Sequence, residues 1–312
     1  MEQQTTTEKA QESRERKGHA ELTAHVQREE TQHRAVIEKI RQATPTVKTF
    51  LLRVVDAGSS FTFKPGQWLD CHLPGCEVVG GYSICSSLRQ FQQEGTLLLA
   101  VKFSTHPPAF WMHRTAKEGD IIGMRVGGEF FLSLPHPTRE EEAKAEAAEH
   151  PPLSGLLFIA GGMGINPLYS MLLQLFEPSQ EARREVKALC LYSAKTEEEL
   201  LFGEELRELA KHSHGQLRLH FFLTAPPSSS SSPSSLDASA ETVVRITRGR
   251  RISQEDLQRA LGEELTKRGV AAAERPLCFL CGPPSMTDTL VGLLQQETLF
   301  DPTPHLRFEK WW

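Results

Sequence analysis

Short apolar and β-branched runs, separated by turn residues, follow one another through the first half of the chain. The runs are TVKTFLLRVV, GQWLDCHL, GGYSIC, TLLLAVKF and DIIGMRV. Glycine, proline and acidic residues stand between them, as in DAGSS, KPG and EGD. Several short strands at near-regular spacing are typical of an antiparallel barrel. The pattern therefore predicts an antiparallel Greek-key β-barrel over residues 44–137.

The second half of the chain alternates strand-like with helix-like stretches. The strand-like runs are GLLFIA, VKALCLYSA, LRLHFFLT and LCFLCG. The helix-like stretches are PLYSMLLQLF, TEEELLFGEELRELAKH, ISQEDLQRALGEELTKRG and MTDTLVGLLQQ. Ser253 is the predicted N-cap of the third helix. Because such alternation builds a parallel sheet with helices on its faces, we expect an α/β doubly wound parallel sheet over residues 154–312.

Three stretches fall outside both patterns. Residues 1–43 are polar and charged, which favours a disordered or loosely helical N-terminal segment. Residues 138–153 are rich in Ala and Glu, as expected of an exposed linker between two domains. Residues at about 226–241 hold a run of serines that cannot bury apolar area, so they predict a disordered surface loop.

Charge and composition exclude some classes of protein. The formal net charge of the 312 residues is -5, which argues against a nucleic-acid binder, because such proteins usually carry a basic face. No apolar run approaches the ~20 residues that a membrane-spanning helix needs. The six cysteines lack the spacing of a disulfide framework, which favours a reducing compartment.

Cys278 and Cys281 form a C-x-x-C motif inside a predicted strand. An odd spacing on a strand sends the two side chains to opposite faces of the sheet. A zinc site would also need two further ligands at a matching spacing. The sequence therefore predicts no metal site.

A glycine-rich bend follows the strand that ends at Ala160. Glycine tolerates positive φ and allows close backbone approach. Asn166 is predicted to cap the next helix, and Pro167 suits its first position. The free N–H groups of that first turn would then hold a pyrophosphate, although a tight turn without a ligand is an alternative. On the first interpretation, Gly164→Val should abolish dinucleotide binding and leave the barrel folded.

A second bend, CGPPSM, follows the LCFLC strand. Gly282 and the prolines after it force an abrupt exit from the sheet. Cys281 is either a small buried residue or a sulfur placed beside a ring bound in the cleft. The candidate dinucleotide-binding residues are those of the two bends: Gly161, Gly162, Met163, Gly164, Ile165, Asn166, Pro167, Cys281, Gly282, Pro283 and Met286.

These motifs together resemble the ferredoxin–NADP reductase superfamily of flavin-type reductases, from about residue 45 to the C-terminus. The shared features are a barrel, then G-x-G-x-x-P, then Cys-Gly-Pro. The segments KPGQWLD, GYSICSS, GDIIGMRVGGEFFL and LYSAKTEEELLFGEEL resemble further parts of that pattern. Seven stretches in order resemble one vertebrate branch of the superfamily: VVGGYSICSS, HPPAFW, RVGGEFF, GGMGINPL, YSAKTEEELLF, CGPPSMTD and FEKWW.

The resemblance implies an NAD(P)H-dependent oxidoreductase that passes a hydride from nicotinamide to FAD, and electrons on to an unknown acceptor, a protein or a small molecule. Tyr82 would stack on the isoalloxazine ring, and Ser83 would hydrogen-bond near its N5. Cys281 and Glu309 would lie near the nicotinamide, and Trp312 would cover the flavin. The candidate catalytic residues are therefore Ser83, Cys281, Glu309 and Trp312.

The chain departs from the superfamily at both flavin-phosphate anchors. The arginine of the R-x-Y-S motif is replaced by Gly80, and a phosphate-binding serine is replaced by Ala109. Other arginines could substitute, namely Arg89, Arg114 or Arg125, and Gly80→Arg is expected to raise flavin affinity. The alternative is a degenerate reductase that binds NAD(H) as a sensor or assembly subunit, without flavin chemistry.

The choice between NAD and NADP depends on the end of the second strand of the parallel sheet. Ser193 and Lys195 could bind a 2′-phosphate, whereas Glu197 and Glu198 would repel it. We expect NAD(H). The resemblance also implies a mitochondrial location, but the N-terminus shows no import signal, which leaves a cytoplasmic location as the alternative.

Overall fold

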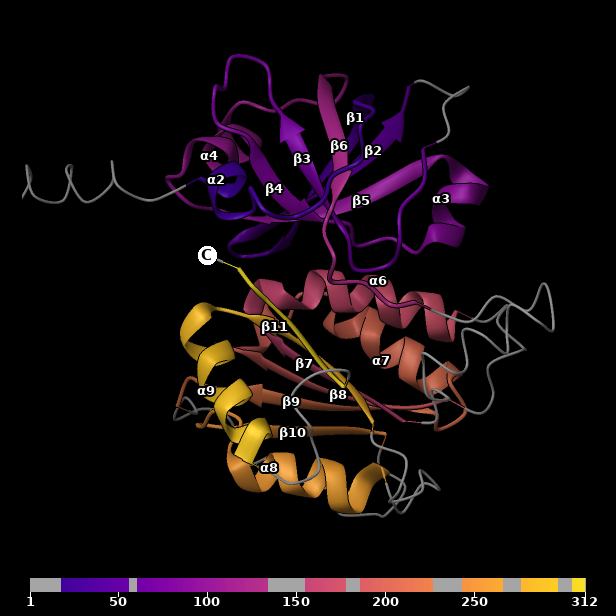
Figure 1. Cartoon of the computed structure of the whole chain (residues 1–312), viewed down its shortest axis with the longest axis vertical. Coiled ribbons are helices and arrows are strands. Elements are labelled where there is room, and N and C mark those ends of the chain that lie inside the picture. Colours follow the sequence, from indigo (N-terminus) through magenta and orange to yellow (C-terminus); the bar gives the residue numbers. More distant parts are fainter. Residues whose placement is uncertain are drawn as a thin grey trace, which may run out of the picture.

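The computed structural model describes residues 18–55, 61–133, 155–177, 186–226, 243–265, 276–296 and 305–311. These residues form an antiparallel barrel stacked on a parallel sheet with helices on both faces, as Figure 1 shows. The predicted fold class is confirmed. The predicted linker at 138–153, most of the serine-rich loop and Trp312 lie outside the described residues.

The barrel consists of antiparallel strands in the order β4-β3-β6-β1-β2-β5. Their bounds are β1 His33–Thr44, β2 Val47–Val54, β3 Trp68–His72, β4 Gly80–Ser83, β5 Thr96–Lys102 and β6 Ile121–Gly127. A bridge between Ile84 and Leu99 brings the two outer strands together, so the sheet closes. Alternate side chains enter a common core, among them Leu69, Leu97 and Ile122.

Strand β1 corrects the predicted domain boundary. The barrel begins at His33, inside the stretch that we expected to be loose. Ala35 and Ile37 are fully buried, while charged residues before and after them are exposed, among them Arg34 and Lys39. Backbone hydrogen bonds to β2 on one side and β6 on the other hold the strand in the sheet. The alternation of buried and exposed positions along β1 was hard to recognise in the sequence, because one buried residue is a small alanine and many of the other residues are charged.

Three short helices accompany the barrel: α2 His19–Leu22, α3 Leu88–Glu94 and α4 Pro107–Arg114. The sequence pattern allowed loose helix around α2 and predicted neither α3 nor α4. Ser87 caps α3 with a reciprocal bond to Gln90, whereas α4 begins with two prolines and has no side-chain cap. Helix α2 lies against β4 (Figure 1).

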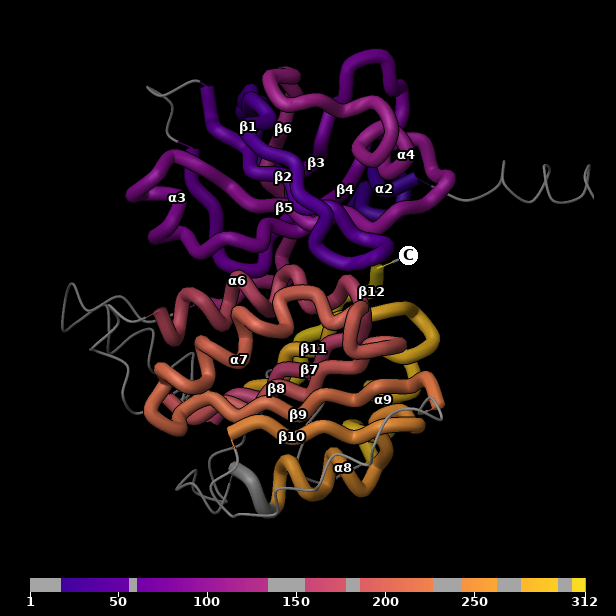
Figure 2. The backbone as a smooth tube through the Cα atoms, turned by 180° about the vertical axis from the view of Figure 1, so that it is seen from behind, coloured from indigo at the N-terminus to yellow at the C-terminus, as the bar shows by residue number. Residues whose placement is uncertain are grey.

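All strands of the second sheet run parallel, in the order β10-β9-β8-β7-β11-β12. Their bounds are β7 Gly155–Gly161, β8 Lys187–Ala194, β9 Leu217–Leu223, β10 Val244–Arg248, β11 Leu277–Gly282 and β12 Leu306–Lys310. The pattern predicted the inner four strands and missed β10 and β12, which carry polar residues and lie at the edges. In Figures 1 and 2, β12 runs toward the barrel beside α2 and β4.

Helices cover both faces of this sheet. On the barrel side lie α6 Ile165–Phe176 and α7 Gly203–His212, and on the other side α8 Gln254–Arg259 and α9 Pro284–Gln296. Ser253 caps α8, as predicted. The predicted helix before β9 is interrupted, because Phe202 has φ 59° and separates the short turn Glu197–Glu199 from α7.

Helix α6 joins the two domains. All its residues except Gln174 are buried, because the helix lies between the sheet and the barrel (Figure 2). Asn166 Nδ2 donates to the Ala100 carbonyl at 3.0 Å, and Ser170 Oγ donates to the Ser86 carbonyl at 2.7 Å. The barrel is thus hydrogen-bonded to the same helix that begins at the glycine-rich bend.

Cys278 and Cys281 lie on opposite faces of the parallel sheet, as their spacing predicted. All six cysteines are free. Within the described ranges, no group of His, Cys, Asp and Glu side chains is arranged to hold a metal ion. None of the helices in those ranges combines the length and apolar character that crossing a bilayer requires.

Candidate functional site

The strand order places a topological switch point between β7 and β11. From β7 the chain first adds β8, β9 and β10 on one side and then β11 and β12 on the other. In open parallel sheets, ligands bind in the crevice beyond the carboxyl ends of the strands at such a point. The glycine-rich bend follows β7 and the CGPP bend follows β11, so the fold brings the two sequence motifs side by side.

Two glycines of the first bend are needed for packing. A Cβ on Gly164 would lie 2.0 Å from the Cys281 carbonyl oxygen, and a Cβ on Gly161 would lie 2.3 Å from the Met286 sulfur. The short 3-10 helix η1 (Gly162–Gly164) therefore rests directly on the end of β11. This contact changes the expectation for Gly164→Val: valine would first disturb the sheet, whatever it did to a ligand.

Gly162 differs from the glycines on either side of it. Its φ is 52°, and a Cβ there would have no atom within 4 Å. Helix α6 then begins at Ile165 without a side-chain cap. The predicted capping role of Asn166 is wrong, because its side chain reaches across to the barrel, and Pro167 is the third helical residue. An uncapped helix start beside open space suits an anion.

Cys281 and Glu309 are partners in the register of β11 and β12. Trp311 Nε1 donates to Glu309 Oε2 at 2.9 Å. Burial raises the pKa of Glu309 to about 8, although hydrogen bonds from Trp311 and Trp68 oppose that rise. Burial and the nearby Glu309 also raise the pKa of the Cys281 thiol. At neutral pH the pair is therefore an uncharged carboxyl beside an uncharged thiol.

A cavity of about 570 Å³ opens beside Glu309. Its walls come from the residues before the barrel, from β3, from the residues just after β6, and from β12 with the residue that follows it. The lining residues are His19, Leu22, Thr23, His25, Val26, Trp68, Glu129, Phe130, Arg307, Phe308, Glu309, Lys310 and Trp311. Trp311 supplies an aromatic wall that the resemblance assigned to Trp312.

Tyr82 and Ser83 are not among the residues that line this cavity. Tyr82 pairs with Leu69 and packs against the barrel core, where burial raises the pKa of its phenol. Ser83 is buried on the opposite face of β4. The two residues that the resemblance assigns to flavin thus do not share a surface.

The positions expected to hold flavin phosphates are closed. A Cβ on Gly80 would lie 2.7 Å from the Tyr82 ring and 2.9 Å from Pro108, so an arginine at position 80 has no room. Pro107 and Pro108 start α4 and lack N–H groups, which removes two of its terminal donors. Arg125, a possible substitute cation, is paired with Asp70. The residues on β4 and α4 as arranged here do not fit FAD.

Comparison with known proteins agrees with the two-domain fold. A family model described as the oxidoreductase NAD-binding domain matches residues 158–291. The CS-b5R domains of human Ncb5or (NAD+ form) superpose with a TM-score of 0.64 at 20% identity, over 89% of this chain and 69% of that chain. A ferredoxin NADP+ reductase from Neisseria gonorrhoeae with bound FAD and NADP gives 0.62 at 18% identity, over 90% and 98%.

Strand order and switch point together define a two-domain fold of the kind seen in the ferredoxin NADP+ reductase. Oxidoreductase NAD-binding domain-containing protein 1 of Danio rerio is 36% identical over 305 residues, which cover 96% of this chain and 99% of the relative. The chain belongs to that protein's family, and it is an NAD(P)H oxidoreductase.

Sequence reasoning missed the residues on the barrel side of the cavity. His19 and Trp68 line it, Asp70 and Arg28 contact these two side chains, and no spacing in the sequence connects the four residues. One signal was present. Gly81 stands inside a strand, and a glycine there marks a close approach by another group.

Proposed function

We propose that the chain binds NAD(H) across the carboxyl ends of β7 and β11, with the pyrophosphate against Gly162 and the first turn of α6. One observation carries the proposal: the glycine that faces open space and the uncapped helix start meet at the switch point of the sheet. Backbone amides and the helix dipole favour an anion at such a place.

We further propose a preference for NADH over NADPH. At the end of β8, Glu197 pairs with Arg207 at 3.3 Å and with Arg248 at 2.8 Å, so two cations of this edge are already neutralised. Glu198 adds an exposed negative charge beside them. A 2′-phosphate at this edge would meet carboxylates before it met an arginine. Glu197→Gln should therefore reduce the difference between the dissociation constants for NADH and NADPH.

In this proposal the hydride acceptor is a small organic molecule that binds in the cavity beside Glu309. NAD(H), when bound, supplies the hydride. Trp68 and Trp311 would exclude water and hold the acceptor, and Glu309 would present a proton to an acceptor oxygen, because its pKa of about 8 keeps it protonated at neutral pH. The flavin implied by the resemblance stays a prediction, and no step here depends on it.

The second candidate function is an NAD(H)-binding sensor without chemistry. The closed phosphate positions around Gly80 and Pro108 favour it, because a reductase without a flavin has lost one usual carrier. NADH oxidation that depends on an added organic acceptor would support the enzyme, and NADH binding without turnover would support the sensor.

A matched pair of glycine variants tests the dinucleotide site. Gly162 and Gly215 both have positive φ and open space around a new Cβ. Alanine should therefore lower the free energy of unfolding of each variant by a similar amount, about 1–2 kcal/mol. Only Gly162→Ala should raise the Kd for NADH, by about tenfold or more, in calorimetric titration. Equal affinities in the two variants would contradict the proposed position of the pyrophosphate.

A further inference from the structure

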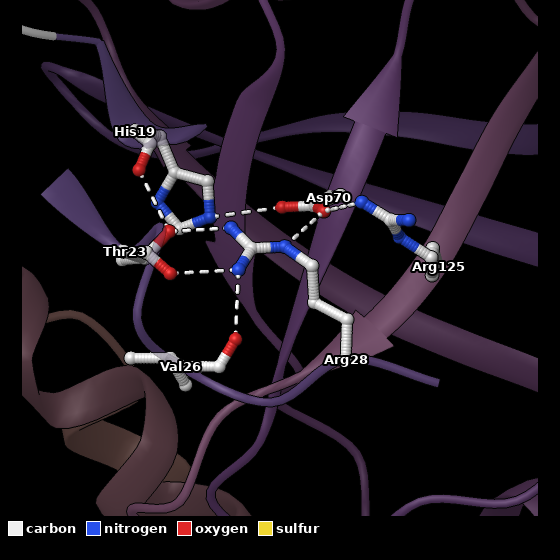
Figure 3. Close-up of polar contacts among 6 residues, drawn as sticks. All are labelled: His19, Thr23, Val26, Arg28, Asp70 and Arg125. Carbon is white, nitrogen blue, oxygen red and sulfur yellow. Dashed lines mark hydrogen bonds and ion pairs between the residues drawn. The ribbon is translucent and has the colours of Figure 1, made fainter. Parts of the chain in front are cut away.

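A buried carboxylate on the outer face of the barrel binds the segment that precedes it. Asp70 on β3 is 1% exposed. It accepts hydrogen bonds from Arg28 Nε at 2.7 Å and Arg125 Nη2 at 2.9 Å, and it lies 3.1 Å from His19 Nε2 (Figure 3). Two of these three groups come from residues before the first strand. Burial alone would raise the pKa of Asp70, but these bonds hold it well below its usual range.

Arg28 also closes the segment on itself. Its guanidinium donates to the Thr23 carbonyl at 2.7 Å, to the Val26 carbonyl at 2.9 Å and to Thr23 Oγ1 at 2.5 Å (Figure 3). The same group lies 4.9 Å from the centre of the Trp68 ring. Residues 18–28, hereafter the N-terminal strap, are thus a folded turn fixed to the barrel by charge and by aromatic contact.

The His19 ring occupies a slot shaped for it. A Cβ on Gly81 would lie 2.1 Å from His19 Nδ1, so only a glycine on β4 admits the ring. Trp68 meets the ring edge-on at a centroid distance of 4.5 Å, and Trp311 stacks on it at 6.0 Å. The other face of β4 is closed at Gly80, as described above. Both faces of β4 are therefore covered by the chain's own residues.

We infer that the N-terminal strap covers the face of β4 that carries Gly81 and Ser83, one of the two positions that the resemblance gives to a flavin, and that this oxidoreductase works without bound FAD. The strap also forms one wall of the cavity beside Glu309, so it belongs to the acceptor site. This inference rests on the proposed function for its acceptor, but the exclusion of FAD follows from the contacts of His19 and Gly80 alone.

Cofactor analysis of the full-length protein tests the exclusion of FAD. After purification, heat-released supernatant is assayed for flavin fluorescence, and the protein is titrated with FAD and, separately, with NADH. The expected result is no stoichiometric flavin and no saturable FAD binding, with NADH binding retained. One FAD bound per chain would overturn the inference. Failure to bind NADH would instead overturn the proposed function, so the two failures are distinguishable.

A double-mutant cycle tests whether the strap fills the slot in solution. Gly81→Ala should lower Tm by about 4 °C or more in the wild-type background, because the new methyl group meets the His19 ring. In the His19→Ala background the same change should cost less than about 1 °C. Glu21→Gln, an exposed change in the same strap, is the control background and should leave the full cost in place.

Two outcomes of the cycle contradict the inference. An equal cost of Gly81→Ala with and without the His19 ring would mean that the ring does not lie on β4. If Gly81→Ala alone does not fold, the double variant with His19→Ala should fold, and its failure to do so would also overturn the inference.

Discussion

Two glycine-rich stretches of this chain look alike in sequence and differ in what they face. In the bend after β7, Gly162 faces open space. In strand β4, Gly80 faces Tyr82 and Pro108, and Gly81 faces His19. A glycine motif thus indicates that another group lies close to the backbone, but it does not identify that group as a ligand or as part of the protein. The packing around each glycine makes that distinction.

The bend after β7 and the region around β4 also differ in their charged groups. On the outer face of the barrel, the Asp70 carboxylate is paired with two arginines and lies against His19, so the cations there are already engaged. At the start of α6, no side chain in the described part of the chain caps the helix. An anionic ligand would therefore find donors at the bend and paired cations near β4. Four changes test this contrast, in decreasing order of expected effect.

The largest effect is expected from Gly164→Val. A Cβ at this position would lie 2.0 Å from the Cys281 carbonyl oxygen, and backbone cannot move aside as a flexible side chain can. We expect a loss on the order of 3 kcal/mol or more in the free energy of unfolding, measured by urea denaturation. A stability equal to that of the wild type would show that η1 does not rest on β11.

Glu309→Gln should change how stability depends on pH. Folding raises the pKa of this group from its usual value near 4.5 to about 8, so its contribution is complete below pH 4.5 and is lost as pH rises toward 8. Glutamine stays neutral, and the variant should therefore gain on the order of 3 kcal/mol over the wild type between pH 5 and pH 8. If the difference in unfolding free energy between the variant and the wild type were the same at pH 5 and pH 8, folding would not keep the Glu309 carboxyl neutral.

Gly80→Arg reverses the expectation drawn from the sequence. Because a side chain at this position meets the Tyr82 ring and Pro108, the variant should lose roughly 1–3 kcal/mol and gain no FAD affinity. Glu77→Arg, an exposed change close by in sequence, is the control for added charge. Saturable FAD binding by Gly80→Arg would show that only the missing cation keeps flavin away.

The smallest effect is expected where helix α6 meets the barrel. Ser170→Ala removes the buried hydrogen bond to the Ser86 carbonyl and should cost about 1–2 kcal/mol in thermal unfolding. Thr289→Ala loses a similar bond on the exposed face of α9 and should change stability much less. Equal costs would mean that water replaces the Ser86 contact and that α6 is not fixed to the barrel there.

Much of the fold could be predicted because its strands and helices carry regular periods. Barrel strands β2 to β6, the inner strands of the parallel sheet and the cap at Ser253 all follow from local pattern. Strand β1 was missed because charged residues surround Ala35 and Ile37, and β12 because LRFEK mixes polar and apolar positions. Edge strands need fewer buried residues, so their pattern is weak.

The candidate site was only partly predictable for a different reason. The bends at Gly162 and Cys281 are each formed by residues close together in sequence, so the spacing of their glycines and prolines predicted them. The strap depends on Asp70, which lies far from His19 and Arg28 in sequence, and only the folded barrel brings them together. Asn166 was misjudged because its partner, the Ala100 carbonyl, belongs to the other domain.

A crystal structure of the full-length protein grown with both NADH and FAD tests the central claim most directly. We expect NADH with its pyrophosphate beside Gly162 and the start of α6, the His19 ring still on Gly81, and no isoalloxazine on β4. A flavin ring on either face of β4 would contradict this expectation, as would NADH bound away from the ends of β7 and β11.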